Sequence, residues 1–550
     1  MPPRTGKAGP PLGFPDWAAL TASSAAWPAR RPGRRGKVLI ATNIGGHGPV
    51  GVMESTLAAA LALRDAEVEI VLCDAALPAC LRAEYSDLPD DTILTQRRLP
   101  TTFCPTCQKH GRAMFEPLGL KIRFLSELIT DADRQEALDI AETTPASAIQ
   151  GFVLDGLTIG EHARAGALRY YTRGDLAAEP NGETVLRRYL EASILSVRAY
   201  QRLLKEGGYD AAVFHHGLYV PQGLVGEVCR AEGVRVINWV VAYRNNSFIL
   251  SHEDTYHHTL MSEPVAAWED MAWGDPQREE ITAYLKSRWR GDRDWIGFHE
   301  RPEEDAGTVL RSMGLDLTRP IVGMLSNVVW DAQLHYPANA FASQTDWAVR
   351  TIEYFATRPD LQLLLRVHPA EVRGTAPSRQ PFAAEITRRV PTLPPNVFII
   401  PPESPISTYA AMDLCDSVLI YGTKMGVELT PMGVPVVVAG EAWIKNKGLT
   451  LDAASPEDYI RILQRLPFGR RLEPEVVDRA LKYAFHFFFR RMIPLRFFRK
   501  VSSSLFFTPD IASVDELAEG RDGALDLVCE AILTGSPFVF PAESLGVHER

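Results

Sequence analysis

The chain has 550 residues, of which 46% are hydrophobic and 23% charged, with a formal net charge of −10. This composition is that of a globular protein with a real core, and the acidic balance argues against broad nucleic-acid binding. No apolar run approaches the roughly 20 residues that cross a bilayer, and seven cysteines in this length do not form a disulfide scaffold. We therefore expect a cytoplasmic protein of several domains.

The first elements follow a proline- and arginine-rich leader. Residues 1–36 lack the apolar segment of a secretory signal, so we expect them to be disordered or loosely attached. Residues 37–42 read as a buried strand, 43–49 as a glycine-rich turn, 52–64 as a helix and 68–72 as a second strand. This β-loop-α-β pattern opens a Rossmann-like domain.

The remainder of the first domain is predicted from its composition and from the glycines and prolines that interrupt it. Residues 132–204 are largely helical, and two strands at 211–214 and 234–241 enclose a helix at 223–232. We therefore expect residues 37–256 to form a Rossmann-like acceptor domain with a helical insertion.

A second α/β pattern begins after a connecting segment at residues 257–318. Residues 319–466 are predicted to form a Rossmann-like nucleotide-sugar domain, and residues 467–550 a C-terminal helical segment. The strands expected in this second domain are residues 320–325, 361–365, 397–400, 417–421 and 434–438. The predicted fold class is α/β, with two Rossmann-like domains facing a cleft, which is the GT-B architecture.

Polar side chains follow the strands of the second domain. Ser326 and Asn327 end its first strand, and Arg366 and His368 end the next. Open α/β sheets bind ligands, often phosphates, at this edge. We predict that His368 donates to a phosphate oxygen and that Arg366 adds a fixed positive charge. The alternative for His368 is an ordinary capping His-Pro turn.

A further strand leads through Tyr421-Gly422-Thr423 into a helix. Backbone N–H groups and the Thr423 hydroxyl are expected to point into the same edge, and Gly422 lets a ligand approach the backbone. Glu428 lies further into this helix, where a carboxylate can accept hydrogen bonds from sugar or ribose hydroxyls. The alternative for Glu428 is a helix acid stabilised by the macrodipole.

These segments resemble the bacterial capsule-polysaccharide biosynthesis family, whose members are Kdo-transferase-like GT-B glycosyltransferases. The likeness covers about residues 319–452 and rests on His368-Pro369, Tyr421-Gly422-Thr423, Glu428 with Gly433-Val-Pro435, and residues 440–452. It implies transfer of a sugar from a nucleotide donor such as CMP-Kdo to a surface-polysaccharide or glycolipid acceptor. It also implies that His368 and Thr423 hold the nucleotide phosphate. The family usually has a lysine near its His-Pro and Ser-Ser or Ser-Thr at the helix start, whereas this chain has Arg366 and Gly422-Thr423.

The glycine-rich turn of the first domain carries the candidate base. Residues 45–49 are similar to the glycine-rich loop of many GT-B glycosyltransferases, and a neutral His47 could take the proton from an acceptor hydroxyl. The alternative is a histidine that caps the helix. Glu54 lies about two helical turns further on and is the second candidate base. Its alternative is an exposed helix acid.

Two residues are predicted on the acceptor side. His216, in the run His215-His216-Gly217, follows one strand of the first domain, and Arg244 follows the next. Both therefore belong to the same edge of the sheet, where Arg244 could neutralise an anionic sugar or a phosphate.

Four cysteines are a candidate for a structural zinc site, which needs four ligands. Cys104-Pro-Thr-Cys107 is a C-x-x-C pair, and Cys73 and Cys80 are the obvious second pair, with His110 as a substitute for one of them. Reduced buried thiols or a redox pair are the alternatives. Sugar transfer itself is expected to need no cofactor, because cations and a helix N-terminus take the place of a metal.

The sequence also suggests binding partners and alternative functions. The basic and aromatic run at residues 482–500 could lie on an anionic inner-membrane surface, or it could pack as a C-terminal helix. A CDP-polyol phosphotransferase or a nucleotide-sugar epimerase could use the same architecture. The alternative of another class is a non-catalytic GT-B scaffold in polysaccharide assembly. We expect a nucleotide-sugar donor and a glycan acceptor as partners, and no nucleic acid.

Overall fold

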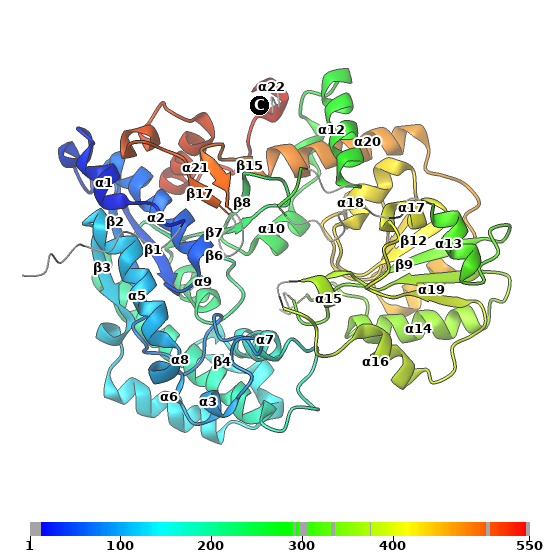
Figure 1. Cartoon of the computed structure of the whole chain (residues 1–550), viewed down its shortest axis with the longest axis horizontal. Helices are drawn as coiled ribbons and strands as arrows, with labels where there is room; N and C mark the ends of the chain where they lie inside the picture. The colour runs from blue at the N-terminus through cyan, green and yellow to red at the C-terminus, as the bar shows by residue number, and fades with distance from the viewer. Residues whose placement is uncertain are drawn as a thin grey trace, which may run out of the picture. The chain divides into compact units, whose positions relative to one another are not determined.

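The computed structural model describes residues 13–289, 293–295, 303, 305–331, 336–374, 376–501 and 507–545. The chain divides into two compact units (Figure 1). Unit 1 consists of residues 1–171, 176–256 and 492–540, and unit 2 of residues 172–175, 257–491 and 541–550. Each unit is built on a sheet with helices of the Rossmann-like type, so the predicted fold class of two such α/β domains is confirmed.

Unit 1 contains a seven-stranded sheet in the order β15-β8-β7-β6-β1-β2-β3. The five strands from β7 to β3 run parallel, whereas β8 pairs antiparallel with β7, and β15 antiparallel with β8. These strands are β1 (Lys37–Asn43), β2 (Glu67–Leu72), β3 (Lys121–Phe124), β6 (Ala211–His215), β7 (Arg235–Val241), β8 (Ser247–His252) and β15 (Ile493–Pro494). The main helices are α1 (Trp17–Ala22), α2 (Gly48–Leu63), α5 (Cys104–Phe115), α6 (Asp131–Thr143), α7 (Gly160–Tyr171), α8 (Gly182–Gly207), α9 (Gln222–Ala231) and α21 (Gly523–Thr534).

The connections of unit 1 diverge between β1 and β6. The chain leaves β1 through α2 toward β2, and it leaves β6 through α9 toward β7, in the opposite direction along the sheet. Because such crossovers are right-handed, α2 and α9 cover opposite faces. The carboxyl ends of β1 and β6 therefore form a topological switch point, the place where open α/β sheets bind ligands.

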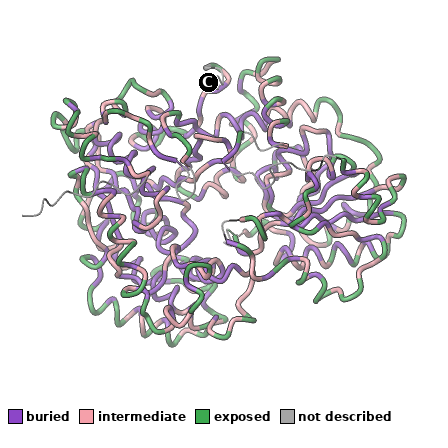
Figure 2. The backbone as a smooth tube through the Cα atoms, viewed as in Figure 1, coloured by how far each residue is buried: buried purple, intermediate pink, exposed green. Residues whose placement is uncertain are grey.

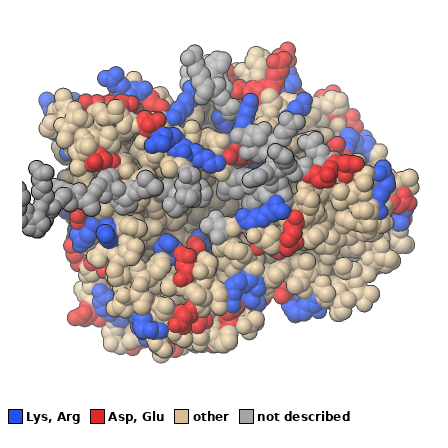
Figure 3. All heavy atoms as spheres, in the orientation of Figure 1, with Lys and Arg blue, Asp and Glu red and all other residues tan. Residues whose placement is uncertain are grey.

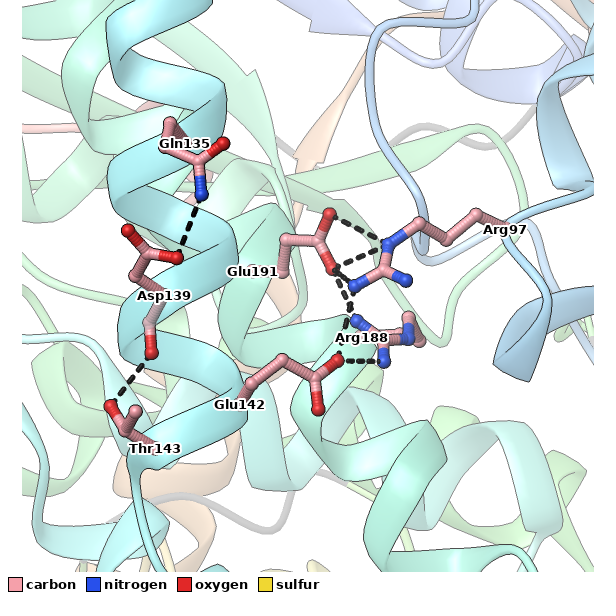
Figure 4. A network of polar contacts seen from close by, with 7 residues as sticks. All are labelled: Arg97, Gln135, Asp139, Glu142, Thr143, Arg188 and Glu191. Carbon is pink, nitrogen blue, oxygen red and sulfur yellow. Dashed lines mark hydrogen bonds and ion pairs between the residues drawn. The ribbon is translucent and has the colours of Figure 1, made fainter.

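The predicted helical insertion of unit 1 is held by a charged network between α6 and α8 (Figure 4). Arg188 donates to Glu191 (2.5 Å) and also contacts Glu142, while Arg97 donates to Glu191 at 3.1–3.2 Å. Arg188 and Glu191 are buried. A buried charge is costly without partners, so this network fixes how α8 lies against α6.

Unit 2 contains a six-stranded parallel sheet in the order β11-β10-β9-β12-β13-β14. Its central strands are buried (Figure 2). The strands are β9 (Ile321–Leu325), β10 (Gln362–Arg366), β11 (Val397–Ile400), β12 (Ser417–Ile420), β13 (Val436–Val438) and β14 (Leu451–Asp452). The main helices are α10 (Tyr256–Ser262), α11 (Ala266–Glu269), α12 (Asp275–Arg288), α13 (Ala306–Ser312), α14 (Gln344–Ala356), α15 (Ala370–Arg373), α16 (Phe382–Arg389), α17 (Thr408–Asp413), α18 (Met425–Leu429), α19 (Pro456–Leu463) and α20 (Pro474–Phe485).

The connections of unit 2 diverge between β9 and β12. From β9 the chain proceeds to β10 and β11, and from β12 it proceeds to β13 and β14 on the other side. The carboxyl ends of β9 and β12 are therefore the switch point of this unit. Large side chains such as Trp347 of α14 fill the core beside the sheet, and burying each Leu or Val side chain contributes about 1.5–3 kcal/mol.

The ends of the chain differ from the sequence-based expectations. Residues 1–12 of the expected disordered leader lie outside the described residues, but residues 13–36 contain α1, whose Trp17 is fully buried. Residues 257–318 were expected to connect two domains, and the described part of them belongs to unit 2. The expected helical segment at residues 467–550 is divided, because residues 492–540 join unit 1 and supply β15 to its sheet.

Most aromatic residues of the basic run at 482–500 are buried. Phe485, Phe487, Phe488 and Phe489, in α20 and the π-helical turn His486–Arg490 after it, are each at most 1% exposed. In the described part of the chain, every helix is too short or too polar to cross a bilayer. Basic and acidic side chains are interspersed over the face drawn in Figure 3.

Candidate functional site

The two residues after β9 join the neighbouring strand ends of unit 2. The Ser326 hydroxyl accepts a hydrogen bond from the backbone N–H of His368, after β10, at 3.0 Å. The Asn327 side-chain oxygen accepts one from the backbone N–H of Gly422, after β12, at 3.3 Å. Gln344 holds Asn327 in turn, through both its amide oxygen and nitrogen. Four predicted donor-site residues therefore meet at the switch point.

The imidazole of His368 has a defined tautomer. Its Nδ1 accepts a hydrogen bond from the backbone N–H of Ala370 at 3.0 Å, so the ring hydrogen of the neutral form lies on Nε2. Burial lowers the pKa of His368 to about 4, and the positive charges of Lys424 and Arg366 contribute to this shift. At neutral pH His368 is therefore an uncharged hydrogen-bond donor in positive surroundings.

The start of α18 brings a lysine that sequence reasoning missed. Thr423 is 7% exposed, and its hydroxyl accepts from the backbone N–H of Met425 at 3.3 Å. The next residue, Lys424, is near enough to act on the pKa of His368. Its signal in the sequence was a lysine directly after Gly-Thr at a strand-to-helix turn. Tyr421 serves the fold, because its hydroxyl donates to the carbonyl of Phe341 at 2.8 Å.

Arg366 is directed at the main chain. Its side chain is 1% exposed and donates to the carbonyls of Pro401 and, at 3.1 Å, Ser404. Burial lowers the pKa of Arg366 to about 10, so the group remains a cation at neutral pH. These bonds fix the loop after β11, and its charge reaches the site through the field that it exerts on His368.

Glu428 differs from the expectation that it meets sugar or ribose hydroxyls. It is 2% exposed, and one carboxylate oxygen accepts from Arg288 (3.0 Å) and Lys424 (2.9 Å). The other oxygen accepts from the hydroxyl of Tyr409 at 2.6 Å. Burial would raise the pKa of Glu428, but Arg288 and Lys424 hold it below its usual value. Glu428 is thus a buried carboxylate that fixes the position of Lys424.

Three histidines meet at the switch point of unit 1. His47 follows β1, while His215 and His216 lie at the end of β6, and His215 is 5.5 Å from each of the other two between ring centroids. Within the described part of the chain, the buried Nδ1 atoms of all three have no hydrogen-bond partner. The sequence pattern predicts a role for His216 but not for His215, which is the residue that joins the other two.

The histidines of unit 1 are held neutral. Burial, together with the positive charge of Arg169, lowers the pKa of His47 to about 4 and that of His216 to about 3. Arg82 adds to the effect on His47. Sequence reasoning missed both arginines, since neither Arg82 nor Arg169 follows a strand of the sheet.

Glu54 lies in the core beneath this edge. It is fully buried, and its carboxylate accepts from the indole N–H of Trp239 at 2.9 Å. Burial raises the pKa of Glu54 to about 7, and hydrogen bonds from Thr42 and Trp239 offset only part of that effect. Glu54 is therefore neither an exposed helix acid nor a carboxylate that an acceptor can reach.

Arg244 lies in the loop between β7 and β8 and is 5% exposed.

The four predicted zinc ligands lie around one cavity of unit 1. Cys73, Cys80, Cys104 and Cys107 all line it, whereas His110 stands edge-on to Phe14 with ring centroids 5.9 Å apart. In the residues that the structure describes, however, no three His, Cys, Asp or Glu side chains are placed to hold a metal ion. The four cysteines therefore share one cavity, and a structural zinc ion bound to them stays a prediction.

Comparison with known proteins adds structural neighbours only. No protein-family model and no curated protein matches the chain. Solved structures that align with it include Thermosulfurimonas dismutans KpsC, a beta Kdo 2,4 transferase, with 13% identity over 50% of this chain and 80% of that chain and a TM-score of 0.34. The UDP-GlcNAc 2-epimerase of Neisseria meningitidis bound to UDP-GlcNAc aligns with 9% identity over 81% and 98%, at a TM-score of 0.25. CalG4, the calicheamicin glycosyltransferase, aligns with 13% identity over 82% and 94%, at 0.22. Scores this low carry no argument about substrate or mechanism.

Proposed function

We propose that the chain is a glycosyltransferase that binds the phosphate of a nucleotide-sugar donor at the β9–β12 switch point of unit 2. One observation carries this proposal: Ser326 and Asn327 join three strand ends there, one of which leads into the neutral His368, and Lys424 is near enough to act on the pKa of that histidine. The sequence resemblance supplies the donor class, with CMP-Kdo as the first candidate, and a surface polysaccharide or glycolipid as the acceptor class.

The chemistry of sugar transfer fits these groups. As the bond between the sugar and the phosphate oxygen breaks, negative charge develops on the leaving nucleotide. A cation and a preorganised N–H donor stabilise that charge most when they are fixed beforehand. Lys424 is fixed by Glu428 at 2.9 Å, and the Nε2–H of His368 is fixed by the hydrogen bond to its Nδ1. The Thr423 hydroxyl adds a third polar group.

The histidines of unit 1 suit the activation of an acceptor hydroxyl. A neutral His47 can accept a proton, but a pKa of about 4 makes it a weak base in the free chain. Arg169 and Arg82 contribute to that low pKa, so an anion bound beside them would raise it toward neutrality. We therefore propose an acceptor that carries a carboxylate or phosphate near the hydroxyl that reacts.

The donor site is tested by calorimetric titration of the full chain with CMP, CDP, UDP and GDP. We expect one of them to bind, and the His368→Ala variant to bind it about 10- to 100-fold more weakly, because a hydrogen bond to a charged group contributes about 1.5–3 kcal/mol. Lys424→Met should weaken binding similarly. The matched control is Lys286→Met, an exposed lysine of α12. Failure of all four nucleotides to bind, or unchanged affinity in His368→Ala, contradicts the assignment.

The reaction is tested with donors labelled in the sugar. Movement of the label to a glycan acceptor, with release of the nucleotide, supports transfer. Interconversion of the nucleotide sugar without acceptor favours an epimerase. Release of CMP from a CDP-polyol, with the polyol phosphate moved to the acceptor, favours a phosphotransferase. Binding without any of these reactions favours the scaffold.

A further inference from the structure

A cavity of unit 1 is lined by four cysteines from three segments of the chain. Cys73 follows β2, Cys80 lies in the loop beyond it, and Cys104 and Cys107 occupy the first turn of α5. Residues three apart on a helix share a face, so both thiols of α5 point to one side. The cavity holds about 400 Å³ of atom-free space, part of it open to solvent. Of the side chains that line it, only Arg82 is charged.

The four thiols form one electrostatic group. In each of the six pairs that they make, the two sulfurs are close enough for one to raise the pKa of the other. Backbone N–H groups are directed at the sulfurs: Gly46 donates to Cys107 at 3.0 Å, and the N–H groups around Ala76 face Cys73. Such N–H···S bonds are the second shell with which proteins hold the thiolates of a metal centre.

The distance between the sulfur ligands differs between a single zinc ion and an iron–sulfur cluster. A single zinc ion draws four sulfurs to about 3.8 Å from one another, because each Zn–S bond is about 2.3 Å long. No three His, Cys, Asp or Glu side chains in the described part of the chain are placed to hold one metal ion. An iron–sulfur cluster is larger, and four cysteines hold it from around its outside. We propose that Cys73, Cys80, Cys104 and Cys107 bind an iron–sulfur cluster in this cavity.

The balance of charge fits that assignment. Each thiol releases its proton to solvent as its sulfur bonds to iron, so four thiolate charges enter the cavity. Arg82 and the N–H groups directed at Cys73 and Cys107 offset part of them. No oxidation or reduction of the protein is needed for binding.

The cluster would support the loop that carries His47. A Cβ atom placed on Gly46 would lie 3.1 Å from the sulfur of Cys107, and one placed on Gly45 would lie 2.4 Å from the backbone of Gly111. The turn therefore packs directly on α5, at the helix that supplies two of the ligands. This inference does not depend on the proposed sugar transfer.

The test is metal and sulfide analysis of the full chain, purified without oxygen and reconstituted with ferric iron, sulfide and a thiol reductant, which is oxidised to its disulfide as it supplies the two electrons that a four-iron cluster needs. We expect iron and acid-labile sulfide in equal amounts, about two or four of each per chain, and a visible absorption band that bleaches with dithionite. Zinc at one per chain, no bound metal after reconstitution, or iron without sulfide overturns the proposal.

Variants locate the site. Cys80→Ser and Cys104→Ser should each lose most of the iron and sulfide, at least about fivefold, because one of four ligands is gone. Cys229→Ser and Cys529→Ser are matched controls, since both are buried cysteines of unit 1 that do not line the cavity. Circular dichroism verifies that each variant is folded. Full cluster content in both Cys80→Ser and Cys104→Ser, or equal loss in the controls, contradicts the assignment.

Discussion

The two units present the same topological feature with opposite chemistry. In unit 1 the carboxyl ends of β1 and β6 diverge, and in unit 2 those of β9 and β12. The first carries neutral imidazoles above a buried carboxyl group, Glu54, whose pKa is raised to about 7. The second carries Lys424 and Arg366 beside one neutral histidine, with Glu428 ionised beneath. The same backbone geometry thus holds neutral side chains in one unit and charged side chains in the other.

The difference comes from what lies under each edge. Glu54 receives hydrogen bonds from neutral groups such as the Trp239 indole, so burial dominates its pKa. Glu428 is equally buried, but two cations contact it directly. A carboxyl group in a core is therefore neutral or ionised according to its partners and not according to its depth.

The largest expected effect is that of Glu428→Ala in unit 2. The substitution leaves Arg288 and Lys424 buried without their shared partner, which costs about 3–5 kcal/mol of unfolding free energy. Chemical denaturation measures it. The control is Glu353→Ala, an exposed acid 3.3 Å from Arg350, which should change stability by less than about 1 kcal/mol. Equal effects of both substitutions would mean that the buried ion pairs of Glu428 do not stabilise this edge of unit 2.

The neutral character of unit 1 is tested by Glu54→Gln. The folded-state pKa of Glu54 is raised from 4.5 to about 7, so the stability gained from the protonated carboxyl group is present below pH 4.5 and lost as the pH rises through 7. The amide does not ionise and should make the protein more stable than the wild type at pH 8, by up to about 3 kcal/mol, with no gain at pH 4.5.

Denaturant midpoints at the two pH values measure this difference. Glu232→Gln, an exposed acid of the same unit, is the matched control and should show none of it. If Glu54→Gln gains nothing at pH 8, Glu54 has a charged partner and the contrast between the units fails.

Sequence patterns predict the polar residues at strand ends but not the long-range contacts that those residues make. His47, His216, Ser326 and His368 were predictable because an apolar run ends in a polar turn at each of them. The partner of Glu428, Arg288, lies 140 residues earlier, and no local periodicity connects the two. The pairing of β15 with β8 joins segments that are likewise far apart in the chain. Long-range packing and desolvation decide these features, and a single sequence does not display either.

The histidines of unit 1 predict a loss of stability in acid. The folded-state pKa of His216 is lowered from 6.5 to about 3, so the neutral ring contributes its full stability above pH 6.5, and this stability falls as the pH decreases toward the folded value. His216→Asn should remove this dependence and gain about 1 kcal/mol relative to the wild type at pH 5.5. Asparagine is chosen because it tolerates the positive φ of 66° at this position.

Midpoints of unfolding at pH 7.5 and 5.5 measure that prediction. His110→Asn, a histidine outside the cluster, is the control and should leave the acid dependence unchanged. A wild-type protein whose stability is constant between these pH values would show that the cluster is open to protonation in the folded state.

The smallest expected effect is that of Asn327→Ala, which removes the bridge between the ends of β9 and β12. Gly422 is exposed, so its N–H can bond to water instead, and the cost to stability is at most about 1 kcal/mol. Nucleotide affinity should fall by about 3- to 10-fold, because the strand ends are less well fixed before binding. Thr387→Ala, an exposed threonine of α16, is the control. A loss as large as that of His368→Ala would place Asn327 on the ligand itself, whereas no loss would mean that the charges alone hold the nucleotide.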